Sequence, residues 1–316
     1  MNTFTGLFQN VNDDRNIPVH LPEYSLSKRL DNILLGCDQD FIALSEITIK
    51  HLYMVLEKLA ALGYRCSHMA YSPNQFPDMS FYHVLAWKNS IELIDITQYW
   101  FTDTPTTELT PETRKADPVL VKYAEQFEKG TLIGVFKAGS GVIIVSVNHF
   151  GLKRFGTDLQ YTNECARMLA SVFDDYSLIY PNATIVAGAD FNAFDDSDHV
   201  DELLMSTDLN DVTPPEKSFC NYPWDLGLMR PETRDRILAA REDMKLLTGR
   251  EYIDRAVACL QDLYGGPLCS KIDRILSNRD IAVRTTIDMS VITLANYSEV
   301  PFAPSDHTGY VVTINI

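Results

Sequence analysis

The sequence has no excess of positive charge, although it is long and rich in charged residues. Its 316 residues carry 43 acidic and 27 basic side chains, which gives a formal net charge of −16. A chain this acidic offers no broad basic surface, and this argues against chromatin-type binding driven by the release of counterions from DNA. It does not argue against an enzyme that acts on phosphates, because metal ions supply positive charge locally.

The sequence also lacks a long hydrophobic run and a cysteine pair. No stretch approaches the apolar length that spans a bilayer, and the N-terminal MNTFTGLFQNVNDD has neither the basic start nor the apolar run of a secretory signal. Six cysteines are scattered without a C-x-x-C pair, namely Cys37, Cys66, Cys165, Cys220, Cys259 and Cys269. We therefore expect reduced thiols, no structural zinc site and a cytoplasmic location. The sequence leaves open whether the protein is exported as an effector.

What the sequence does contain is an alternation of strand-like and helix-like segments, with 46% hydrophobic residues and no internal repeat. This composition is typical of a soluble globular protein with a substantial core. Apolar periodicity predicts helices over residues 48–64, with Gly63 as the stop, and over 159–176. Strand patterns cover residues 4–11, 40–46, 81–89, 91–96, 141–150, 183–192, 271–278 and 309–316. The two strands flanking residues 88–90 are typical of a pair joined by a turn.

Residues 211–269 differ in character, because they are rich in helix-forming residues with closely interleaved arginines and acids. We interpret them as a lid-like insertion between two strands of a single domain spanning residues 1–316, since the stretch is short for an independent core. Interleaved charges favour a solvated helical face. Contact with a substrate is the alternative.

Polar side chains stand at the carboxyl ends of several apolar strands: Asn10, Glu46, His149, Asp190 and Asn192. Each has an ordinary explanation by itself. Glu46 fits the first turn of a helix, Asn10 and Asp190 fit turns, and a single histidine after a strand is commonly structural. Together they are harder to attribute to chance, because hard oxygen ligands combined with histidines suit a Mg²⁺-assisted phosphoryl hydrolysis.

The triplet Ser-Asp-His occurs twice, at residues 197–199 and at residues 305–307. The first copy precedes VDELLM, an apparent helix, and Ser197 there is a suitable N-cap, so His199 needs no catalytic explanation. The second copy follows a Pro-containing loop and precedes the last apolar strand, where no helix requires a cap. We therefore expect His307 to be the functional histidine.

Taken in order, FQNVN, DFIALSE, VNHF, GADFN, KIDRIL and SDHTGYVVTI resemble the motifs of the endonuclease/exonuclease/phosphatase superfamily. The resemblance extends from Asn10 to His307. It implies a DNase I-like fold, a four-layer α/β/β/α sandwich with two packed, mainly antiparallel sheets. The active site of that fold lies at one edge, where strand ends from both sheets converge.

The resemblance also implies a bound Mg²⁺ or Mn²⁺. Glu46 is similar to the family's principal metal ligand, and Asn10 to the residue that helps to hold the metal or the phosphate. Asp306 would be a second carboxylate on the metal side. No other cofactor is implied.

The remaining roles concern the attack of water on phosphorus. His307 resembles the general base, and Asp273 the carboxylate that orients it. Asp190 is similar to the residue that positions the water, while Asn192 donates to the phosphoryl oxygens. His149 would stabilise the developing negative charge or protonate the leaving oxygen.

The sequence departs from the family pattern in three places. An alanine separates Gly188 from Asp190, whereas the family has Gly-Asp-Phe-Asn. Residues 80–89, where deoxyribonuclease-like members hold a glutamate that pairs with the histidine matching His149, contain no carboxylate. Of the Trp-Cys-Asp-Arg signature of inositol 5-phosphatases, only Asp273 and Arg274 remain.

These features predict a metal-dependent phosphodiesterase, nuclease-like or acting on a nucleotide-type diester. The alternatives are an inositol phosphate or phosphoinositide phosphatase, and a catalytically inactive binding protein of the same fold. Aromatic residues in 99–101 and 219–224 could stack on bases or belong to the core. The expected partner is a phosphate-ester substrate, and no protein partner is indicated.

Overall fold

The structure is a computed structural model. It describes residues 3–11, 26–71, 81–101, 129–150, 159–193, 198–215, 219–220, 269–286 and 307–316.

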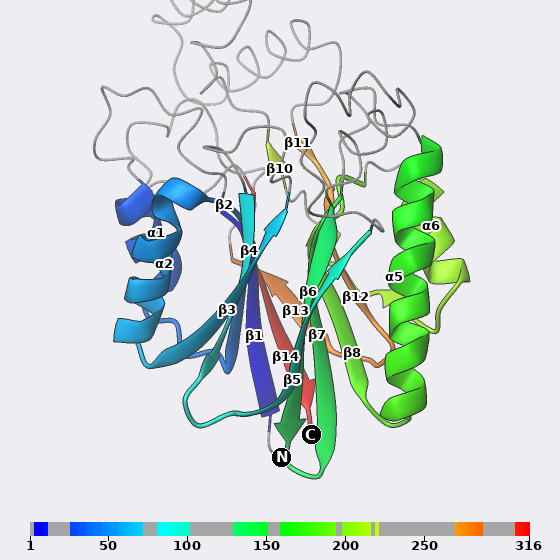
Figure 1. The fold of residues 1–316 in the computed structure, drawn as a ribbon, viewed down its shortest axis with the longest axis horizontal. Coiled ribbons are helices and arrows are strands. Elements are labelled where there is room, and N and C mark those ends of the chain that lie inside the picture. Colours follow the sequence, from blue (N-terminus) through cyan, green and yellow to red (C-terminus); the bar gives the residue numbers. More distant parts are fainter. Residues whose placement is uncertain are drawn as a thin grey trace, which may run out of the picture.

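Two sheets face each other in the centre of the molecule, each with six strands in the described part of the chain (Figure 1). The first sheet has the order β13 (Ala282–Thr285), β14 (Tyr310–Asn315), β1 (Thr3–Asn10), β2 (Phe41–Thr48), β4 (Phe81–Lys88) and β3 (Tyr64–Tyr71). The second has the order β5 (Glu92–Trp100), β6 (Gly130–Ala138), β7 (Gly141–His149), β8 (Thr184–Asp190), β12 (Asp273–Ser277) and β9 (Asn210–Asp211). Only the pairs β1–β2 and β7–β8 are parallel among the described ladders.

Helices cover the outer faces of both sheets. The first sheet carries α1 (Leu26–Leu34) and α2 (Ile49–Ala61), and the second carries α5 (Leu159–Ile179) and α6 (Asp198–Met205) (Figure 1). Among the described helices, none combines the length and the apolar character needed to cross a membrane. The predicted four-layer α/β/β/α sandwich is therefore confirmed.

Three apolar clusters hold these layers together. Between the sheets, Phe4, Phe41 and Phe136 lie nearly parallel or tilted, with ring centroids 5.8 to 6.5 Å apart. A second cluster joins α5 and α6 to one sheet, and a third joins α1 and α2 to the other. Since aromatic side chains bury much apolar surface each, the central cluster fixes how the sheets sit relative to one another.

Both strands flanking residues 88–90 form, but the prediction that they are a pair is wrong, because they lie in different sheets. β4 pairs with β2 and β3, whereas β5 pairs with β6. The burial patterns agree with this arrangement, because β4 has neighbours on both sides and is mostly buried, while β5 is an edge strand with several exposed side chains. The turn thus carries the chain from one sheet to the other.

Most of the predicted insertion, residues 221–268, lies outside the described residues. At its two ends, β10 (Phe219–Cys220) pairs with β11 (Cys269–Ser270), and Cys220 lies opposite Cys269. This pairing brings the two ends of the stretch side by side, as an insertion between neighbouring strands requires. The single-domain organisation with a lid-like insertion stays a prediction.

Gly188 of β8 lies where Phe8 of the first sheet leaves no room for a side chain. A Cβ atom at this position would be 2.6 Å from Phe8 Cδ1 and 2.8 Å from Ile275 Cδ1. We predict that Gly188→Ala lowers the free energy of unfolding by about 1–3 kcal/mol, because both neighbours are core side chains with little room to move. Urea unfolding followed by fluorescence measures this change.

Gly141→Ala is the matched control for Gly188→Ala. It also lies in a strand of the second sheet, and an added Cβ would meet its nearest atom, the Ala138 carbonyl oxygen, at an ordinary 3.6 Å. Equal stability of the two variants would contradict the close approach at Gly188.

Candidate active site

Three of the predicted site residues lie in one row across the second sheet. In the parallel ladder β7–β8, His149 is opposite Asp190, and in the antiparallel ladder β8–β12, Asp190 is opposite Asp273. All three side chains are buried. Strand register alone therefore places one histidine and two carboxylates beside one another.

The first sheet contributes Asn10 and His307 to the same place. Asn10 Nδ2 lies 3.1 Å from Asp190 Oδ2 and 3.3 Å from His307 Nε2. The backbone of His307 is held by Gln9, whose Nε2 donates to the His307 carbonyl oxygen at 3.1 Å. Asn10 thus connects the end of β1 to residues more than 150 positions away in the sequence.

The second Ser-Asp-His copy pairs its histidine with Asp273. His307 Nδ1 lies 2.9 and 3.0 Å from the two carboxylate oxygens of Asp273. A carboxylate only accepts, so Nδ1 carries a hydrogen. Nε2 therefore carries the lone pair, and in the structure this lone pair accepts the side-chain amide hydrogen of Asn10.

Glu46 reaches the site through an irregularity in β2. The register between β2 and β4 shifts between Leu44 and Ile47, and Glu46 has a φ of 56°, in the left-handed region. Its backbone N–H donates to the hydroxyl of buried Tyr71 at 3.0 Å. The bulge turns the Glu46 side chain toward β7, where Oε1 lies 2.8 Å from His149 Nε2.

The charge on Glu46 is favoured by its neighbours. Burial by itself would raise the pKa of this carboxyl, but the hydrogen bond from His149 and the electrostatic effect of His149 and His307 lower its pKa below the usual value. Glu46 is therefore ionised across the neutral range.

The pKa of Asp190 is shifted in the opposite direction to that of Glu46. Burial raises its pKa well above the usual value, and the carboxylates of Asp273 and Glu46 raise it further against the opposing effect of His307. Its Oδ1 accepts the backbone N–H of Asn192 at 2.7 Å, which holds the carboxyl in place. Ionised Asp190 consequently needs more positive charge than these contacts provide.

Asn192 is held beside Asp190 in a left-handed conformation, with a φ of 50°. Its side-chain amide donates to the Phe150 carbonyl oxygen at 2.7 Å. The alanine inserted before Asp190 is accommodated within β8, whose pairing with β7 runs from Thr184 to Asp190 without a shift. Asp190 and Asn192 therefore keep their mutual spacing.

The structure adds residues that the sequence patterns do not reveal. Lys129 Nζ lies 3.1 Å from His149 Nδ1, and the Tyr71 ring stacks on His149 with centroids 5.1 Å apart. His83 lies within residues 80–89, the segment where deoxyribonuclease-like members hold a glutamate. Its ring stacks on the Tyr71 ring, with centroids 4.2 Å apart. Burial and Lys129 lower the pKa of His149 to about 4.

The two Ser-Asp-His histidines have separate environments. His199 Nε2 lies 2.8 Å from the Phe191 carbonyl oxygen, and its ring stacks on Phe150, 5.7 Å away. Its contacts are thus those of a buried structural histidine. Ser197, the predicted N-cap, and Asp306, the predicted second metal carboxylate, lie outside the described residues.

Two overlapping groups could hold a metal ion. Glu46, His149 and Asp190 form one, and Asp190, Asp273 and His307 form the other, each with ligand atoms within 4.8 Å of one another. A divalent cation fits here, because two carboxylates and the Asn10 amide offer the hard oxygen atoms that Mg²⁺ and Mn²⁺ prefer. The raised pKa of Asp190 points the same way, since a cation would neutralise the crowded acids.

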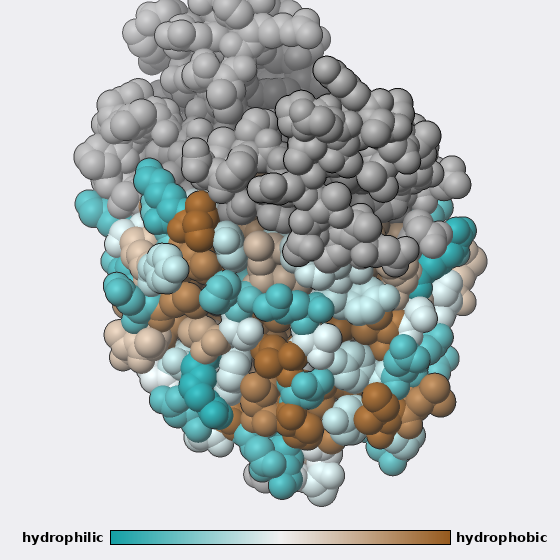
Figure 2. All heavy atoms as spheres, viewed as in Figure 1, coloured by the Kyte–Doolittle hydropathy of each residue, from teal (hydrophilic) through white to brown (hydrophobic). Residues whose placement is uncertain are grey.

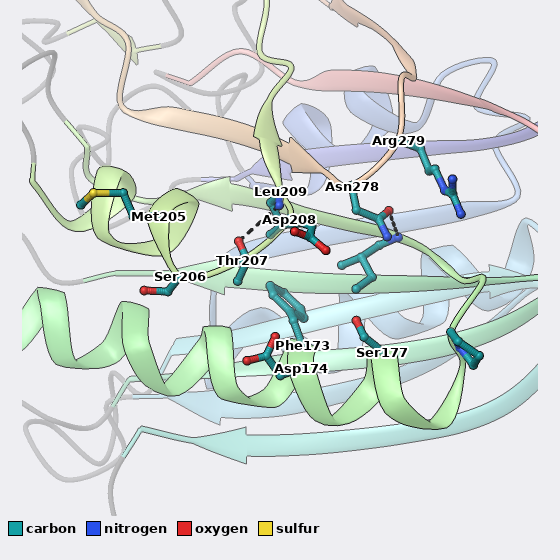
Figure 3. Close-up of a pocket in the computed structure, with 12 residues that line it drawn as sticks. Phe173, Asp174, Ser177, Met205, Ser206, Thr207, Asp208, Leu209, Asn278 and Arg279 are labelled. Atoms are coloured by element: carbon teal, nitrogen blue, oxygen red, sulfur yellow. Dashed lines mark hydrogen bonds between the residues drawn. The ribbon is translucent and has the colours of Figure 1, made fainter.

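A hollow beside α5 lies apart from this group of residues (Figure 3). It has a volume of about 470 Å³ and lies between α5 and the residues that follow α6 and β12. Asp174, Asp208 and Arg279 line it, and it borders Ile185 near the start of β8, whereas Asp190 ends that strand. None of the predicted site residues that the structure describes lines this hollow, so its acids serve as controls for those of the site.

The sequence profile of the Endonuclease/Exonuclease/phosphatase family matches residues 10–307. Among curated proteins, none matches the chain significantly. Solved structures with the same fold include an endonuclease/exonuclease/phosphatase from Bacteroides vulgatus, with a TM-score of 0.62, 14% identity and full coverage of both chains.

Two further solved structures with the same fold are those of Nocturnin and TDP2. The human Nocturnin catalytic domain with bound sulfate has a TM-score of 0.60 and 11% identity, covering 99% of this chain and 93% of that one. TDP2 of D. rerio with a single-strand DNA product has a TM-score of 0.57 and 14% identity, with full coverage of both chains. At such low identities these similarities establish the fold.

We predict that Mg²⁺ or Mn²⁺ stabilises the protein and that Glu46→Gln removes this effect. A ligand that binds the folded state alone adds about 2.7 kcal/mol at a concentration about a hundredfold above Kd. Glutamine keeps an oxygen that accepts from His149 but loses the charge. Thermal unfolding at increasing metal concentration measures the shift.

Asp208→Asn is the matched control, because it removes the charge of an exposed acid that lines the hollow beside α5. It should keep the metal-induced shift of the parent. An undiminished shift in Glu46→Gln would place the metal elsewhere.

Proposed function

Because this chain belongs to the endonuclease/exonuclease/phosphatase family, we propose that it hydrolyses phosphodiesters with the help of Mg²⁺ or Mn²⁺. One observation carries the proposal: the His307–Asp273 pair and the Glu46–His149 pair lie on either side of Asp190, and Asn10 contacts both Asp190 and His307. A binding protein has no need for two oriented histidines around a crowded acid.

Glu46 and Asp190 are the residues we assign to the metal, with Asn10 between them and His307. Bound there, the cation would supply positive charge to the nonbridging oxygens of the substrate. Asp306 remains a further metal ligand predicted from the sequence. The acidic net charge of the chain is compatible with an anionic substrate, because the cation reverses the sign of charge locally.

His307 is the base in this proposal. Its Nδ1–H donates to Asp273, so Nε2 carries the lone pair beside Asp190 and Asn10. A water that replaces the Asn10 amide at Nε2 would give its proton to this nitrogen. Asp273 holds the ring in this tautomer and stabilises the imidazolium that forms. Asp190 Oδ2, 3.9 Å from His307 Nε2, is placed to orient the same water.

Asn192 and His149 are the donors to the phosphoryl group in this proposal. The Asn192 amide gives one hydrogen to Phe150 and has a second one available. His149 Nε2 lies beside Glu46 and Asp190, where its hydrogen would be shared with a bound phosphoryl group. Donors that are held in place before the reaction lose little free energy in reorganising as charge develops.

A nucleic-acid or nucleotide diester is the substrate we favour over an inositol phosphate. The similar structure of TDP2 from D. rerio contains a single-strand DNA product, and that of human Nocturnin contains a sulfate, a tetrahedral oxyanion. The inositol 5-phosphatase signature is reduced to Asp273 and Arg274 in this chain. The phosphorus of a diester substrate carries two ester bonds, whereas that of an inositol phosphate monoester carries one.

We predict that His307→Gln and Asp273→Asn each lower kcat by about 10²–10⁴-fold while the protein stays folded. Asparagine would donate to Nδ1 and so place the hydrogen of His307 on Nε2, the nitrogen that must accept the proton. The measurement is hydrolysis of a bis-aryl phosphodiester and of single-stranded DNA and RNA with Mg²⁺ or Mn²⁺.

His199→Gln is the matched control, since it changes the histidine of the other Ser-Asp-His copy and keeps a donor for Phe191. It should retain parental turnover to within about threefold. Parental turnover in His307→Gln would remove the proposed base. Hydrolysis of monoesters, including inositol phosphates, without hydrolysis of diesters would replace the proposed substrate class.

A further inference from the structure

Arg274 is buried next to the site, on the opposite face of β12 from Asp273. Hydrophilic side chains are spread over the described surface that Figure 2 shows, but Arg274 differs, because only 7% of it is exposed. Since side chains alternate along a strand and Asp273 faces His307, Arg274 extends from the other face of the second sheet. Burying a guanidinium costs free energy, so its contacts must offset that cost.

The Arg274 guanidinium contacts two segments that precede β12 in the sequence. Its Nη2 donates to the Ala193 carbonyl oxygen at 3.0 Å, and its Nε lies 3.8 Å from Asp211 Oδ2. Nε has no hydrogen-bond partner among the residues that the structure describes. The bond to Ala193 is therefore the directed contact of this group, and Asp211 supplies the opposite charge.

Ala193 directly follows Asn192, which the proposed function assigns to the phosphoryl oxygens. Asn192 has a φ of 50°, and few residues other than glycine adopt this left-handed conformation without support from their surroundings. Both polar backbone groups of Ala193 have such support. The Ala193 N–H donates to the Ile272 carbonyl oxygen at 3.3 Å, while the Ala193 carbonyl accepts from Arg274. These two bonds hold the chain immediately after Asn192.

Resting on the proposed function, we infer that Arg274 is a positioning residue that holds the Asn192 turn in place for the phosphoryl group. The Asn192 side-chain amide donates to the Phe150 carbonyl oxygen, and its backbone N–H donates to Asp190 Oδ1, both at 2.7 Å. Neither bond restrains the chain beyond Asn192, so the bonds at Ala193 complete the support. A donor held in this way needs little reorganisation when charge develops on a phosphoryl oxygen.

Asp211 is itself fixed, so it can hold the guanidinium. It belongs to β9, where it lies opposite Leu276 of β12, and its Oδ1 accepts the backbone N–H of Thr213 at 2.9 Å. The Thr213 hydroxyl accepts the backbone N–H of Ile275 at 2.8 Å, which ties this segment to β12. A lysine at position 274 would offer one ammonium on a flexible chain, and could not meet both Ala193 and Asp211 as the planar guanidinium does.

The first test is hydrogen exchange of the Asn192 backbone amide in the metal-free protein, followed by NMR. We expect slow exchange in the parent, because this N–H donates to buried Asp190. Arg274→Met should speed the exchange by about tenfold or more, as is typical for the loss of a hydrogen bond from a charged donor, while amides in the middle of β7 keep their parental rates. Arg274→Lys keeps a donor for Ala193 and should give a smaller increase.

Arg279→Met is the matched control. Arg279 is exposed, comes shortly after β12 and lines the hollow beside α5 (Figure 3). The same substitution at this position should leave both the exchange of the Asn192 amide and the turnover unchanged.

Kinetics show whether Arg274 acts through Asn192. We expect Arg274→Met to lower kcat by about 10–100-fold with little change in KM, as is typical when a residue that orients a site group is lost. Asn192→Gly removes the amide but keeps the left-handed turn, because glycine adopts positive φ freely. Adding Arg274→Met to Asn192→Gly should lower kcat by less than about threefold, since the group that Arg274 positions is already gone.

Three results would overturn the inference. The first is rapid exchange of the Asn192 amide in the parent, which can be observed even if Arg274→Met does not fold. The second is parental exchange in folded Arg274→Met, and the third is that Arg274→Met and Asn192→Gly lower kcat by independent, multiplicative factors. The exchange measurements need no substrate, so their outcome is distinguishable from a failure of the proposed phosphodiesterase activity.

Discussion

The arrangement of the site depends on the burial of one carboxyl group, that of Asp190. Only 2% of this residue is exposed, and it ends β8 of the second sheet. Asn10 from the first sheet and the backbone of Asn192 from the second both donate to it. Asp273 and Glu46 nevertheless raise its pKa, so the protein positions the group without fully compensating its charge. Burying an acid in this state costs stability, and a bound divalent cation would offset that cost. The uncompensated charge of Asp190 is thus the property that suits this place to a cation.

The two histidines beside Asp190 have opposite partners. His307 places Nδ1 against the Asp273 carboxylate, whereas His149 places Nδ1 against the Lys129 ammonium. One side-chain type thereby meets an acceptor in one place and a donor in the other. The difference comes entirely from what lies behind each ring, a carboxylate in one case and an ammonium in the other.

Much of this could be predicted from the sequence, for a physical reason. Asn10, Glu46, His149 and Asp190 each follow an apolar strand, and strand ends are visible as patterns along the chain. Family membership and the layered fold were predictable because these motifs keep their order from Asn10 to His307. Lys129 and Tyr71 were not predictable, since neither belongs to a motif and their importance arises from a cation–π contact and a ring stack. For the same reason, the turn at residues 88–90 indicated two strands but not that they belong to different sheets. Local patterns specify elements, and the partners of each element depend on packing between distant segments.

The departure at Ala189 shows how tightly strand geometry constrains the site. Side chains alternate between the faces of a strand, so Gly188 and Asp190 share a face. Gly188 faces Phe8 of the first sheet, at a distance that leaves no room for a Cβ. Asp190 must then also face the first sheet, where the side-chain amide of Asn10 donates to its carboxylate. If the glycine directly preceded the aspartate, the two residues would lie on opposite faces of β8. The glycine that Phe8 approaches would then not share a face with the aspartate. The added alanine thus puts Gly188, which Phe8 approaches closely, and Asp190 onto one face, two residues apart. The packing around Gly188 in this way helps to set the position of the Asp190 carboxyl group.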